Sequence, residues 1–600
     1  MREQHHRSSR PVDHRSLQGC IYHVNEPERG KQHLDSLPAL TSISRKTVRS
    51  APVCDRAPYR PQGRTERLSC VAEPRREGQH YPSARYTHLQ PLVLSALPRL
   101  RYGVANCWSR LDLVSRLGPS SRRSVWRYIS LSSGSRGIPE NGIALVPAGR
   151  DSTIAVSHTQ EERLLAGGGR HFPVSTFLRL DGPLDTVALR SACDAAVNRH
   201  EGTRISFAMS GSLARIKIAD HLPSDYFQEF LLPPKGNISE RVARAVEILS
   251  DYSEQPFDFV VGPLFRVALV SVSANCFLLG IIMDHIIGDG WSRDIFVRDM
   301  LQIYDATVMG IRHDFPDLPI QFPDFAAWER KFLTGNRLTR LVSHWRASLA
   351  GVDPIPSSRL IDPNAPGGIP HCRAVNTCVD GSVKRQLDAY IRGTSTTMFA
   401  LVAAAVKAAI FAMRRESGED PEGAADVAIM ASAANRIQRE IRDAFGYFAT
   451  PIVLRTNLSG NPTLSELFQR ESRTTLTALR YQQLPHALLI KHLNPTQYGV
   501  RHVSNIDAAP RYVNFDIENK VYREEIRPGG IDVTLVRRPV AAPRGGLRIW
   551  GTDSGQKLWI SLFYRSDLYS DAWSEQFIDY VENILEGTAR DPSRPLQELA

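Results

Sequence analysis

The sequence predicts a mixed α/β protein in which two lobes of strands and helices follow a long N-terminal extension. The residue composition changes near residue 151, and strand and helix patterns then alternate along two stretches of similar length. A Pro/Gly-rich passage at 352–370 separates these stretches. Two lobes joined by a linker leave a cleft between them, which is a common place for a ligand site. We expect the lobes at 151–350 and 374–590 and the linker at 351–373.

The first 150 residues form a basic extension. They hold 25 Lys and Arg against 11 Asp and Glu, whereas the rest of the chain holds 49 against 52. No period of 2 or 3.6 is sustained there, so the segment would bury too little apolar surface to offset its ordering entropy. We therefore expect 1–150 to be disordered and dispensable. An organelle transit peptide, an over-extended translation start and a nucleic-acid-binding arm are the alternatives.

Composition narrows the remaining classes of function. The apolar fraction of 42% and the charged fraction of 23% are ordinary for a globular protein. No apolar run is as long as a membrane span, and the N-terminus lacks the apolar core of a secretory signal. Among the cysteines, Cys372 and Cys378 beside His371 come nearest to a metal spacing, but they lack a second pair. We expect a cytoplasmic protein with reduced thiols, and neither a metal, a membrane nor a nucleic acid as partner.

Apolar spacing places the elements of the two lobes in order. Phe172–Leu180 alternates as a strand does, and Leu184–His200 has apolar residues at helical spacing, with Asp185 suited to its first turn. In the first lobe we expect strands at 172–180, 203–209, 264–272 and 276–283, and helices at 184–200, 242–253, 292–309 and 322–349. In the second lobe we expect strands at 374–379, 427–431, 450–456, 512–517, 531–536 and 558–564, and helices at 382–391, 396–415, 463–481, 486–493 and 571–585.

The stretch 277–292 ends a buried strand in a group of polar side chains. Its first half is an unbroken apolar run of strand length. The polar residues that follow are Asp284, His285, Asp289, Gly290 and Ser292. An imidazole and two carboxylates at the end of a strand are more typical of a functional site than of a hydrophobic core. A His-x-x-x-Asp-Gly match alone is weak, because a lone histidine is more often structural.

Further motifs give this stretch a context. Asp284-His285-Ile-Ile-Gly-Asp289-Gly290-Trp291-Ser292 resembles the His-His-x-x-x-Asp-Gly-x-Ser signature of nonribosomal peptide synthetase condensation domains, which are chloramphenicol-acetyltransferase-like acyltransferases. The other stretches that are similar to family motifs are Arg199-His200-Glu201-Gly-Thr-Arg204-Ile-Ser-Phe207, Phe322-Pro-Asp-Phe-Ala-Ala-Trp328, Phe445-Gly446-Tyr-Phe448 with Leu454-Arg455, Val513-Asn514-Phe515 and Tyr564-Arg-Ser-Asp567. The resemblance covers about 155–588 and implies two chloramphenicol-acetyltransferase-like lobes with mixed sheets and a tunnel between them. The remainder shows no adenylation or carrier domain, so we expect a free-standing condensation protein.

Three positions depart from the family pattern. Asp284 replaces the first His, Thr450 stands where Asn is usual, and Thr203 replaces a Leu. Asp284, Asp289 and Ser292 together also spell the signature of heterocyclisation domains. That branch characteristically lacks the second His, which this chain keeps as His285, so ordinary condensation is favoured.

The resemblance implies attack of an amine or hydroxyl on an acyl thioester held on the phosphopantetheine arm of an acyl or peptidyl carrier protein. No other cofactor is needed, and the acceptor would be a small amine or alcohol. His285 would be the base or would position the nucleophile. Gly290 would let backbone approach the thioester, would permit positive φ, and would offer its N–H to the oxyanion.

The neighbouring residues receive supporting roles. Asp289 is either a dyad partner of His285 or, as the family favours, an anchor for the loop through Arg204 or Arg436. Ser292 would cap the following helix. Trp291 and Asn514 are candidate substrate contacts, although packing suits Trp291 better. Arg199, His200 and Glu201 are expected to be structural.

Three alternatives remain. The chain can be a carrier-independent O-acyltransferase, a heterocyclisation-type enzyme or a catalytically silent platform that recruits a partner. Asp284 in place of the first signature histidine is compatible with a recruitment platform. Retention of His285, Asp289 and Gly290 instead favours an enzyme.

Overall fold

The computed structural model describes residues 143–150, 154–165, 172–210, 213–313, 315–352, 360–493, 513–519, 528–536 and 546–598, and in 513–519 it describes only the side chains of 515 and 516. The predicted disorder of the extension therefore falls, up to residue 142, outside the described residues.

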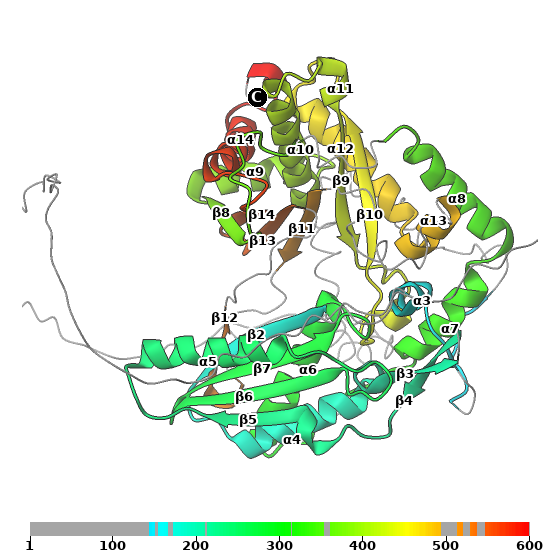
Figure 1. Ribbon diagram of the computed structural model, residues 1–600, viewed down its shortest axis with the longest axis vertical. Coiled ribbons are helices and arrows are strands. Elements are labelled where there is room, and N and C mark those ends of the chain that lie inside the picture. The colour runs from blue at the N-terminus through cyan, green and yellow to red at the C-terminus, as the bar shows by residue number, and fades with distance from the viewer. Residues whose placement is uncertain are drawn as a thin grey trace, which may run out of the picture. The chain divides into compact units, whose positions relative to one another are not determined.

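The first lobe contains two sheets and several helices (Figure 1). Its elements are β1 (Ile154–Ala155), α3 (His158–Leu165), β2 (Pro173–Asp181), α4 (Thr186–Arg199), β3 (Ile205–Ser210), β4 (Leu213–Ile218), β5 (Phe227–Leu231), α5 (Ile238–Ser253), β6 (Phe265–Ser273), β7 (Cys276–Asp284), α6 (Gly290–Val308), α7 (Phe322–Phe332) and α8 (Gly335–Ser348). The small sheet has the order β1-β4-β3. The larger sheet has the order β12-β2-β7-β6-β5, in which β12 (Asp532–Val536) comes from a later part of the chain.

Strand β7 lies in the middle of the larger sheet. It pairs antiparallel with β2 on one side and with β6 on the other, and all nine of its residues are buried. Helix α5 covers one face of the sheet, while α4 and α6 cover the other (Figure 1). A Cβ on Gly280 would lie 2.9 Å from Leu249 of α5, so this helix packs directly on the strand. Burial on both faces explains why β7 is an unbroken apolar run.

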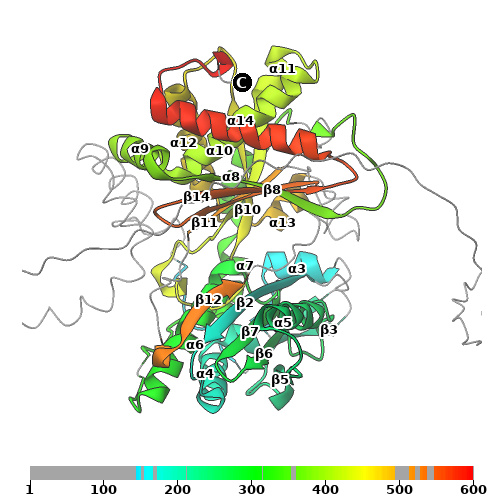
Figure 2. The same cartoon turned by 90° about the vertical axis from the view of Figure 1, so that its left-hand side faces the viewer.

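The second lobe is built on one mixed sheet. Its elements are β8 (Cys372–Val379), α9 (Gly381–Gly393), α10 (Met398–Glu416), α11 (Pro421–Ala425), β9 (Asp426–Ala433), β10 (Thr450–Asn457), α12 (Leu464–Arg480), α13 (His486–Leu493), β11 (Val513–Asn519), β12 (Asp532–Val536), β13 (Leu547–Asp553), β14 (Leu558–Arg565) and α14 (Asp571–Arg590). The sheet order is β10-β9-β11-β13-β14-β8, with β11 parallel to both of its neighbours. Figure 2 shows α9, α10, α12 and α14 together on one face of this sheet. The predicted mixed α/β class is confirmed.

The expected lobe boundaries need three corrections. Strand β12 belongs in sequence to the second lobe but pairs with β2 of the first. Helix α8 packs on the second lobe, where Trp345 Nε1 donates to Tyr481 O at 3.2 Å. Residues 143–150, expected to be disordered, instead contact α7, because the Trp328 indole donates to Ile143 O at 3.0 Å and Arg150 pairs with Asp324 at 2.6 Å. A truncation that preserves the folded part should therefore begin before residue 143 rather than near 151.

Some elements were missed from the sequence. Strands β1, β4, β5 and β13 and helices α3 and α11 have no counterpart in the expected order. Three of these strands hold only two to six residues, and α3 carries a charged side chain at three of its eight positions. Short edge strands and a charged short helix give weak periodicity, so local pattern alone does not separate them from loops.

No single described helix is long and apolar enough to span a bilayer. Only α9 and α10 taken together are long and apolar enough among the described helices, and the two are bent by 113° at the break between them. Residues 400–414 of α10 are all buried.

Candidate active site

The candidate site begins where β7 ends. Asp284 is the last residue of β7, the backbone N–H of His285 donates to Phe172 O at 3.0 Å, and α6 begins at Gly290. His285 to Asp289 therefore form a short connection from a central strand to a helix N-terminus. Because both ends of this connection are buried elements, its side chains are held in fixed places.

The imidazole of His285 lies between two aromatic rings. Its centroid is 5.4 Å from that of Phe172, in a stacked arrangement, and 4.4 Å from that of Tyr447, which comes from the second lobe. The side chain is half-buried, and Nδ1 has no hydrogen-bond partner within the described part of the chain. Burial and the charge of Arg163 lower the pKa of His285, against opposing effects of its own backbone and of the charges of Asp289 and Asp284. The ring is therefore neutral, and able to accept a proton, at pH 7.

Asp289 does not form a dyad with His285. Its Oδ1 accepts from the backbone N–H of Ser292 at 2.8 Å and caps α6, while Oδ2 accepts from the backbone N–H groups of Phe448 and Ala449, both at 3.0 Å. Arg436 of the second lobe lies 3.3 Å from Oδ1. Burial tends to raise the pKa of Asp289, but Arg436 and the bonds from Ser292 and Ala449 outweigh it and lower this pKa. Asp289 is thus an ionised anchor that ties the loop to the other lobe.

Ser292 joins this anchor in a role that differs from the expected helix cap. Asp289 occupies the cap position, and Ser292 lies in the first turn of α6. The Ser292 hydroxyl lies 2.7 Å from Asp289 Oδ1 and 2.6 Å from Gly446 O, and it accepts from Gly446 N and from Arg436. A Cβ on Gly446 would overlap the side chain of Phe322, so close packing requires glycine there. The two lobes meet through this buried polar cluster.

Asp284, at the place of the first signature histidine, is fully buried and paired. Arg163 of α3 donates to its Oδ1 at 2.9 Å, and the backbone N–H of Ile286 donates to the same atom at 2.8 Å. The carboxylate thus holds α3 against the loop that carries His285. In this chain the unusual Asp is matched by a cation on a neighbouring helix.

Two further candidates differ from expectation, and the contact predicted for Asn514 stays a prediction. Gly290 has no positive φ, and a Cβ there would meet no described atom within 4 Å, so neither backbone strain nor packing requires glycine. Trp291 is 40% exposed, and its Nε1 donates to Arg442 O of the second lobe at 3.2 Å, so it is only partly a packing residue. Asn514 lies in β11, but its side chain is outside the described residues.

Arg204 is not the partner of Asp289. Its guanidinium donates to backbone carbonyl groups, those of Val197 at 3.4 Å and Asp220 at 3.2 Å among them, and also contacts Ala219 O. It therefore closes the turn around β3, and Arg436 alone of the two predicted partners reaches Asp289.

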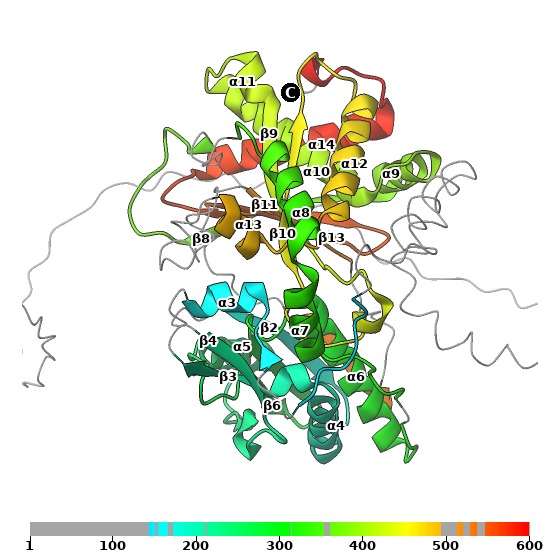
Figure 3. The ribbon, with the colours of Figure 1, turned by 90° about the vertical axis from the view of Figure 1, so that its right-hand side faces the viewer.

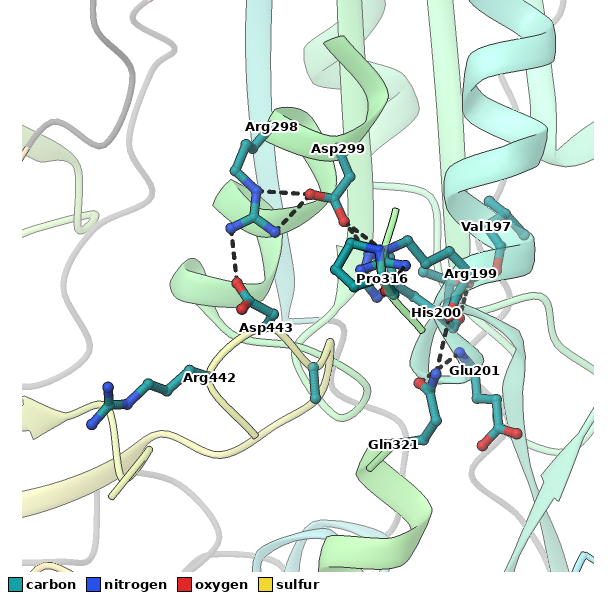
Figure 4. Close-up of polar contacts among 12 residues, drawn as sticks. Val197, Arg199, His200, Glu201, Arg298, Asp299, Pro316, Gln321, Arg442 and Asp443 are labelled. Carbon is teal, nitrogen blue, oxygen red and sulfur yellow. Dashed lines mark hydrogen bonds and ion pairs between the residues drawn. The ribbon is translucent and has the colours of Figure 1, made fainter. Parts of the chain in front are cut away.

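A second buried cluster on α6 was missed from the sequence (Figure 4). Asp299 accepts from Arg199 at 3.0 Å, lies 3.0 Å from His200 Nε2 and pairs with Arg298 at 2.6 Å. Arg298 continues to Asp443 of the second lobe at 2.9 Å. Burial raises the pKa of Asp299, but the His200 bond and Arg298 together lower it, while burial lowers the pKa of His200. Arg199 and His200 therefore have the structural surroundings expected of them.

The described residues contain no group of three or more His, Cys, Asp and Glu side chains placed to hold a metal ion. Cys372 and Cys378 lie near the two ends of β8. At about 3.3 Å per residue along a strand, their backbones are roughly 20 Å apart, which is too far for a shared ion.

A family model described as Condensation domain matches residues 151–600. Malpinin synthetase of Mortierella alpina is 28% identical over 470 residues, and a linear gramicidin synthase protein of Brevibacillus parabrevis is 29% identical over 464 residues. Both alignments cover 76% of this chain, but only 6% and 9% of those relatives. The chain thus spans less than a tenth of their length.

Solved structures share the fold. The X-domain in complex with OxyB from teicoplanin biosynthesis superposes with a TM-score of 0.60 at 23% identity, over 78% of this chain and 99% of that chain. SgcC5 of Streptomyces globisporus gives 0.57 at 22% identity, over 74% of this chain and 100% of that chain. The starter condensation domain of rhizomide synthetase RzmA gives 0.58 at 17% identity, over 75% of this chain and 99% of that chain. Because the family model covers well over half of the sequence, this chain belongs to the condensation-domain family of nonribosomal peptide synthetase systems.

Proposed function

We propose that this protein is a condensation enzyme, which joins an acyl or aminoacyl thioester on a carrier protein to an amine or hydroxyl acceptor. The observation that carries the proposal is His285, a neutral imidazole held between Phe172 and Tyr447 at the end of a buried strand. His285 keeps part of its side chain exposed at the end of a central strand, whereas the structural His200 is fully buried against Asp299. A positioned imidazole that is not wholly enclosed can take up and release a proton.

The chemistry follows from the groups at the loop. The acceptor nitrogen or oxygen attacks the thioester carbonyl carbon, the new C–N or C–O bond forms, and the C–S bond breaks to release the phosphopantetheine thiol. His285 takes the proton that the nucleophile loses, or orients the nucleophile for attack. Gly290 is the first residue of α6, where backbone N–H groups have no intrahelical acceptor, so its N–H can donate to the developing oxyanion.

Asp289 and Arg436 support this chemistry from a distance. Their buried contact fixes the loop between β7 and α6 against the second lobe. Pre-organisation of a base by a rigid neighbouring shell is what keeps it aligned with its substrate.

The test is single-turnover product formation by His285→Ala, with donors loaded on a carrier protein and products identified by mass spectrometry. We expect the rate to fall by roughly 10²–10⁴-fold, the usual contribution of a positioned acid or base. The melting temperature should change little, because the lost ring is half-buried. Undiminished product formation on a substrate pair that the wild-type protein converts would refute the proposal.

A recruitment platform is the second candidate function. Asp284 replaces a signature histidine, and the similar X-domain was solved in complex with a partner, OxyB. A platform would bind a partner enzyme and need no base, so a His285→Ala variant would still support product formation by the whole pathway. The same variant therefore separates the two functions.

Transfer onto a small alcohol without a carrier, and ring formation of the heterocyclisation type, are further versions of the enzymatic proposal. Comparison of carrier-loaded with free acceptors, and the mass of the product, which is one water lower after cyclodehydration, would distinguish them.

A further inference from the structure

The segment between β9 and β10 carries part of the second lobe to the first. Figure 3 shows this yellow segment reaching from β10 to α6 and α7. The N–H of Gly446 donates to the Ser292 hydroxyl at 3.0 Å. The N–H of Phe448 donates to Asp289 at 3.0 Å. The backbone on both sides of Tyr447 is therefore bonded to the start of α6.

Close packing holds the same segment against the loop of His285. Phe445 is fully buried, and a Cβ added to Gly288 of that loop would lie 3.1 Å from its ring. Phe448 is buried as well, and its ring packs on two phenylalanine rings of α7. Tyr447 lies between these two phenylalanines in the chain, so hydrogen bonds and packing together fix its place against the first lobe.

Tyr447 and Phe172 flank the imidazole of His285 from different lobes. Phe172 precedes β2 of the first lobe; its ring stacks on the imidazole, and its carbonyl group accepts from the His285 N–H at 3.0 Å. Tyr447 comes from the second lobe, and its ring centroid lies 4.4 Å from that of His285 at an interplanar angle of 48°. One half of this aromatic clamp is thus bonded to the backbone of the histidine, and the other half depends on contact between the lobes.

The clamp takes the place of an orienting carboxylate. A catalytic imidazole is normally oriented by a hydrogen bond from its second ring nitrogen to a carboxylate or carbonyl group. The two neighbouring aspartates, Asp284 and Asp289, are instead committed to arginines and to backbone N–H groups. Rotation about the Cβ–Cγ bond of histidine has broad minima. The two flanking rings therefore decide which way the imidazole of His285 faces.

Tyr447 acts on the imidazole as a neutral ring. Burial is the main reason that the pKa of Tyr447 is raised to about 12, so the phenol keeps its proton at neutral pH. A neutral ring in contact limits the rotation of the imidazole and excludes water from its face. Phenylalanine, which lacks only the hydroxyl group, should do the same.

We propose that Tyr447 is a positioning residue for His285, through which contact between the two lobes holds the imidazole in its working orientation. The inference rests on the proposed function, in which His285 takes the proton of the nucleophile or orients it. It goes beyond that function because it makes the base depend on a residue of the other lobe. If the segment before β10 moved away from α6, His285 would keep Phe172 but lose the opposite wall, and its ring would no longer be aligned with the nucleophile.

The test compares Tyr447→Ala with Tyr447→Phe in the full-length protein. Steady-state rates with carrier-loaded donors give kcat and KM, and NMR of ¹³C-labelled histidine follows the titration of His285, whose signal is assigned from its loss in His285→Ala. We expect Tyr447→Ala to lower kcat by about 10–100-fold, as misalignment of a reacting group does, and to leave KM nearly unchanged. Tyr447→Phe should keep kcat near that of the wild type.

The titration of His285 is a readout that a merely structural role of Tyr447 would not move. Burial is the largest of the causes that lower the pKa of His285. Removal of the Tyr447 ring would let water reach the imidazole, so this pKa should rise toward its ordinary value. The NMR titration and the acid limb of the pH–rate profile should therefore both move to higher pH in Tyr447→Ala and stay in place in Tyr447→Phe.

Tyr481→Ala is the matched control. Tyr481 is half-buried like Tyr447, and its ring stacks on that of His344 of α8, with the centroids 3.5 Å apart. The variant removes a histidine–tyrosine contact of the same kind but leaves the clamp around His285 intact. It should shift the titration of His344 alone and leave kcat unchanged.

A wild-type kcat in Tyr447→Ala, or an unchanged titration of His285 in that variant, would overturn the inference. So would a loss of kcat in Tyr447→Phe as large as that in Tyr447→Ala, because the hydroxyl group rather than the ring would then be responsible. If Tyr447→Ala melts far below the wild type, Tyr447→Leu decides in its place, since leucine keeps the apolar bulk without a flat ring and should still lower kcat. The titration needs no turnover, so its result is independent of the His285→Ala test of the proposed function.

Discussion

His200 and His285 differ in what surrounds them, although each stands near an aspartate of α6. The His200 ring is fully buried, and its Nε2 lies 3.0 Å from Asp299, which also binds Arg199 and Arg298. The oxygens of Asp289 are instead taken by backbone N–H groups and Arg436, so they leave the imidazole of His285 alone. One histidine is part of a buried ionic cluster, and the other stands beside such a cluster.

The difference shows how one helix can supply rigidity and reactivity at once. Asp289 and Asp299 both link α6 to the second lobe, directly through Arg436 and indirectly through Arg298 and Asp443. The ionic contacts thus fix the position of α6 and of the loop before it. His285 takes no part in these ionic contacts, so in the proposed reaction its ring would act from a fixed position.

The largest effect on stability is expected from Asp299→Asn. The substitution would leave the guanidinium groups of Arg199 and Arg298 without their buried counter-charge and would weaken the His200 contact. Breaking a buried ion cluster by removal of one partner should lower the free energy of unfolding by about 3 kcal/mol or more. Urea denaturation would measure it. Product formation by the remaining folded protein should be nearly that of the wild type, and a selective loss of turnover would contradict the structural role of this cluster.

Compared with Asp299→Asn, the substitution Asp289→Asn should lower stability less and lower catalytic activity more. Asparagine can still cap α6, and Arg436 keeps its bonds to the carbonyl groups of Ile441 and Ala444, at 2.7 and 2.6 Å. We expect the free energy of unfolding to fall by about 2 kcal/mol, which is typical for the loss of hydrogen bonds to a charged group. Turnover should fall with it, because the His285 loop loses its anchor. Lost turnover with unchanged stability would instead make Asp289 catalytic.

The same variant has a signature in the pH dependence of stability. The folded pKa of Asp289 lies below its ordinary value, so its ionisation stabilises the fold. That contribution is fully present above the unfolded pKa and is lost as pH falls through the folded pKa. The stability difference between wild type and Asp289→Asn should therefore shrink in acid, and a constant difference down to low pH would show that charge is not its source.

The two histidine clusters also show what the sequence could predict. The His285–Asp289 spacing was visible because both residues lie on one short loop, and the family resemblance supplied Arg436. His200 and Asp299 are far apart in the chain, so no spacing connects them. Tyr447 and Phe172, which enclose His285, come from other elements as well. The prediction that Arg204 pairs with Asp289 was wrong, because the guanidinium of Arg204 donates to nearby backbone carbonyl groups instead.

For the fold, too, local features were predicted from the sequence and long-range pairings were not. Strands β2, β6 and β7 were predicted because their burial imposes a local pattern on the sequence. The pairing of β12 with β2 of the other lobe was not, since a strand pattern does not state which edge it joins. Predictions from sequence were therefore best where one segment carries the whole signal.

Arg163→Gln is expected to shift the pH dependence of catalysis. Arg163 repels a proton on His285 and, with burial, keeps the pKa of that ring below its ordinary value. Without this charge the pKa of His285 should rise. The acid limb of the pH–rate profile should therefore move to higher pH. An unchanged limb would mean that another group titrates in the rate-limiting step.

The smallest effect is expected from the outer pair of the Asp299 cluster. Arg298 and Asp443 lie 2.9 Å apart, but their side chains are 22% and 42% exposed, so water screens them. A double-mutant cycle with Arg298→Met and Asp443→Asn should give a coupling energy of about 0.2–1 kcal/mol, as for other partly exposed pairs. The coupling should fall further in high salt, whereas the Asp289→Asn effect, which comes from a buried contact, should depend much less on salt. A coupling energy of several kcal/mol would instead show that the Arg298–Asp443 pair contributes strongly to the contact between the lobes. The buried contacts of Asp289 would then not be enough to explain how the loop of His285 is fixed.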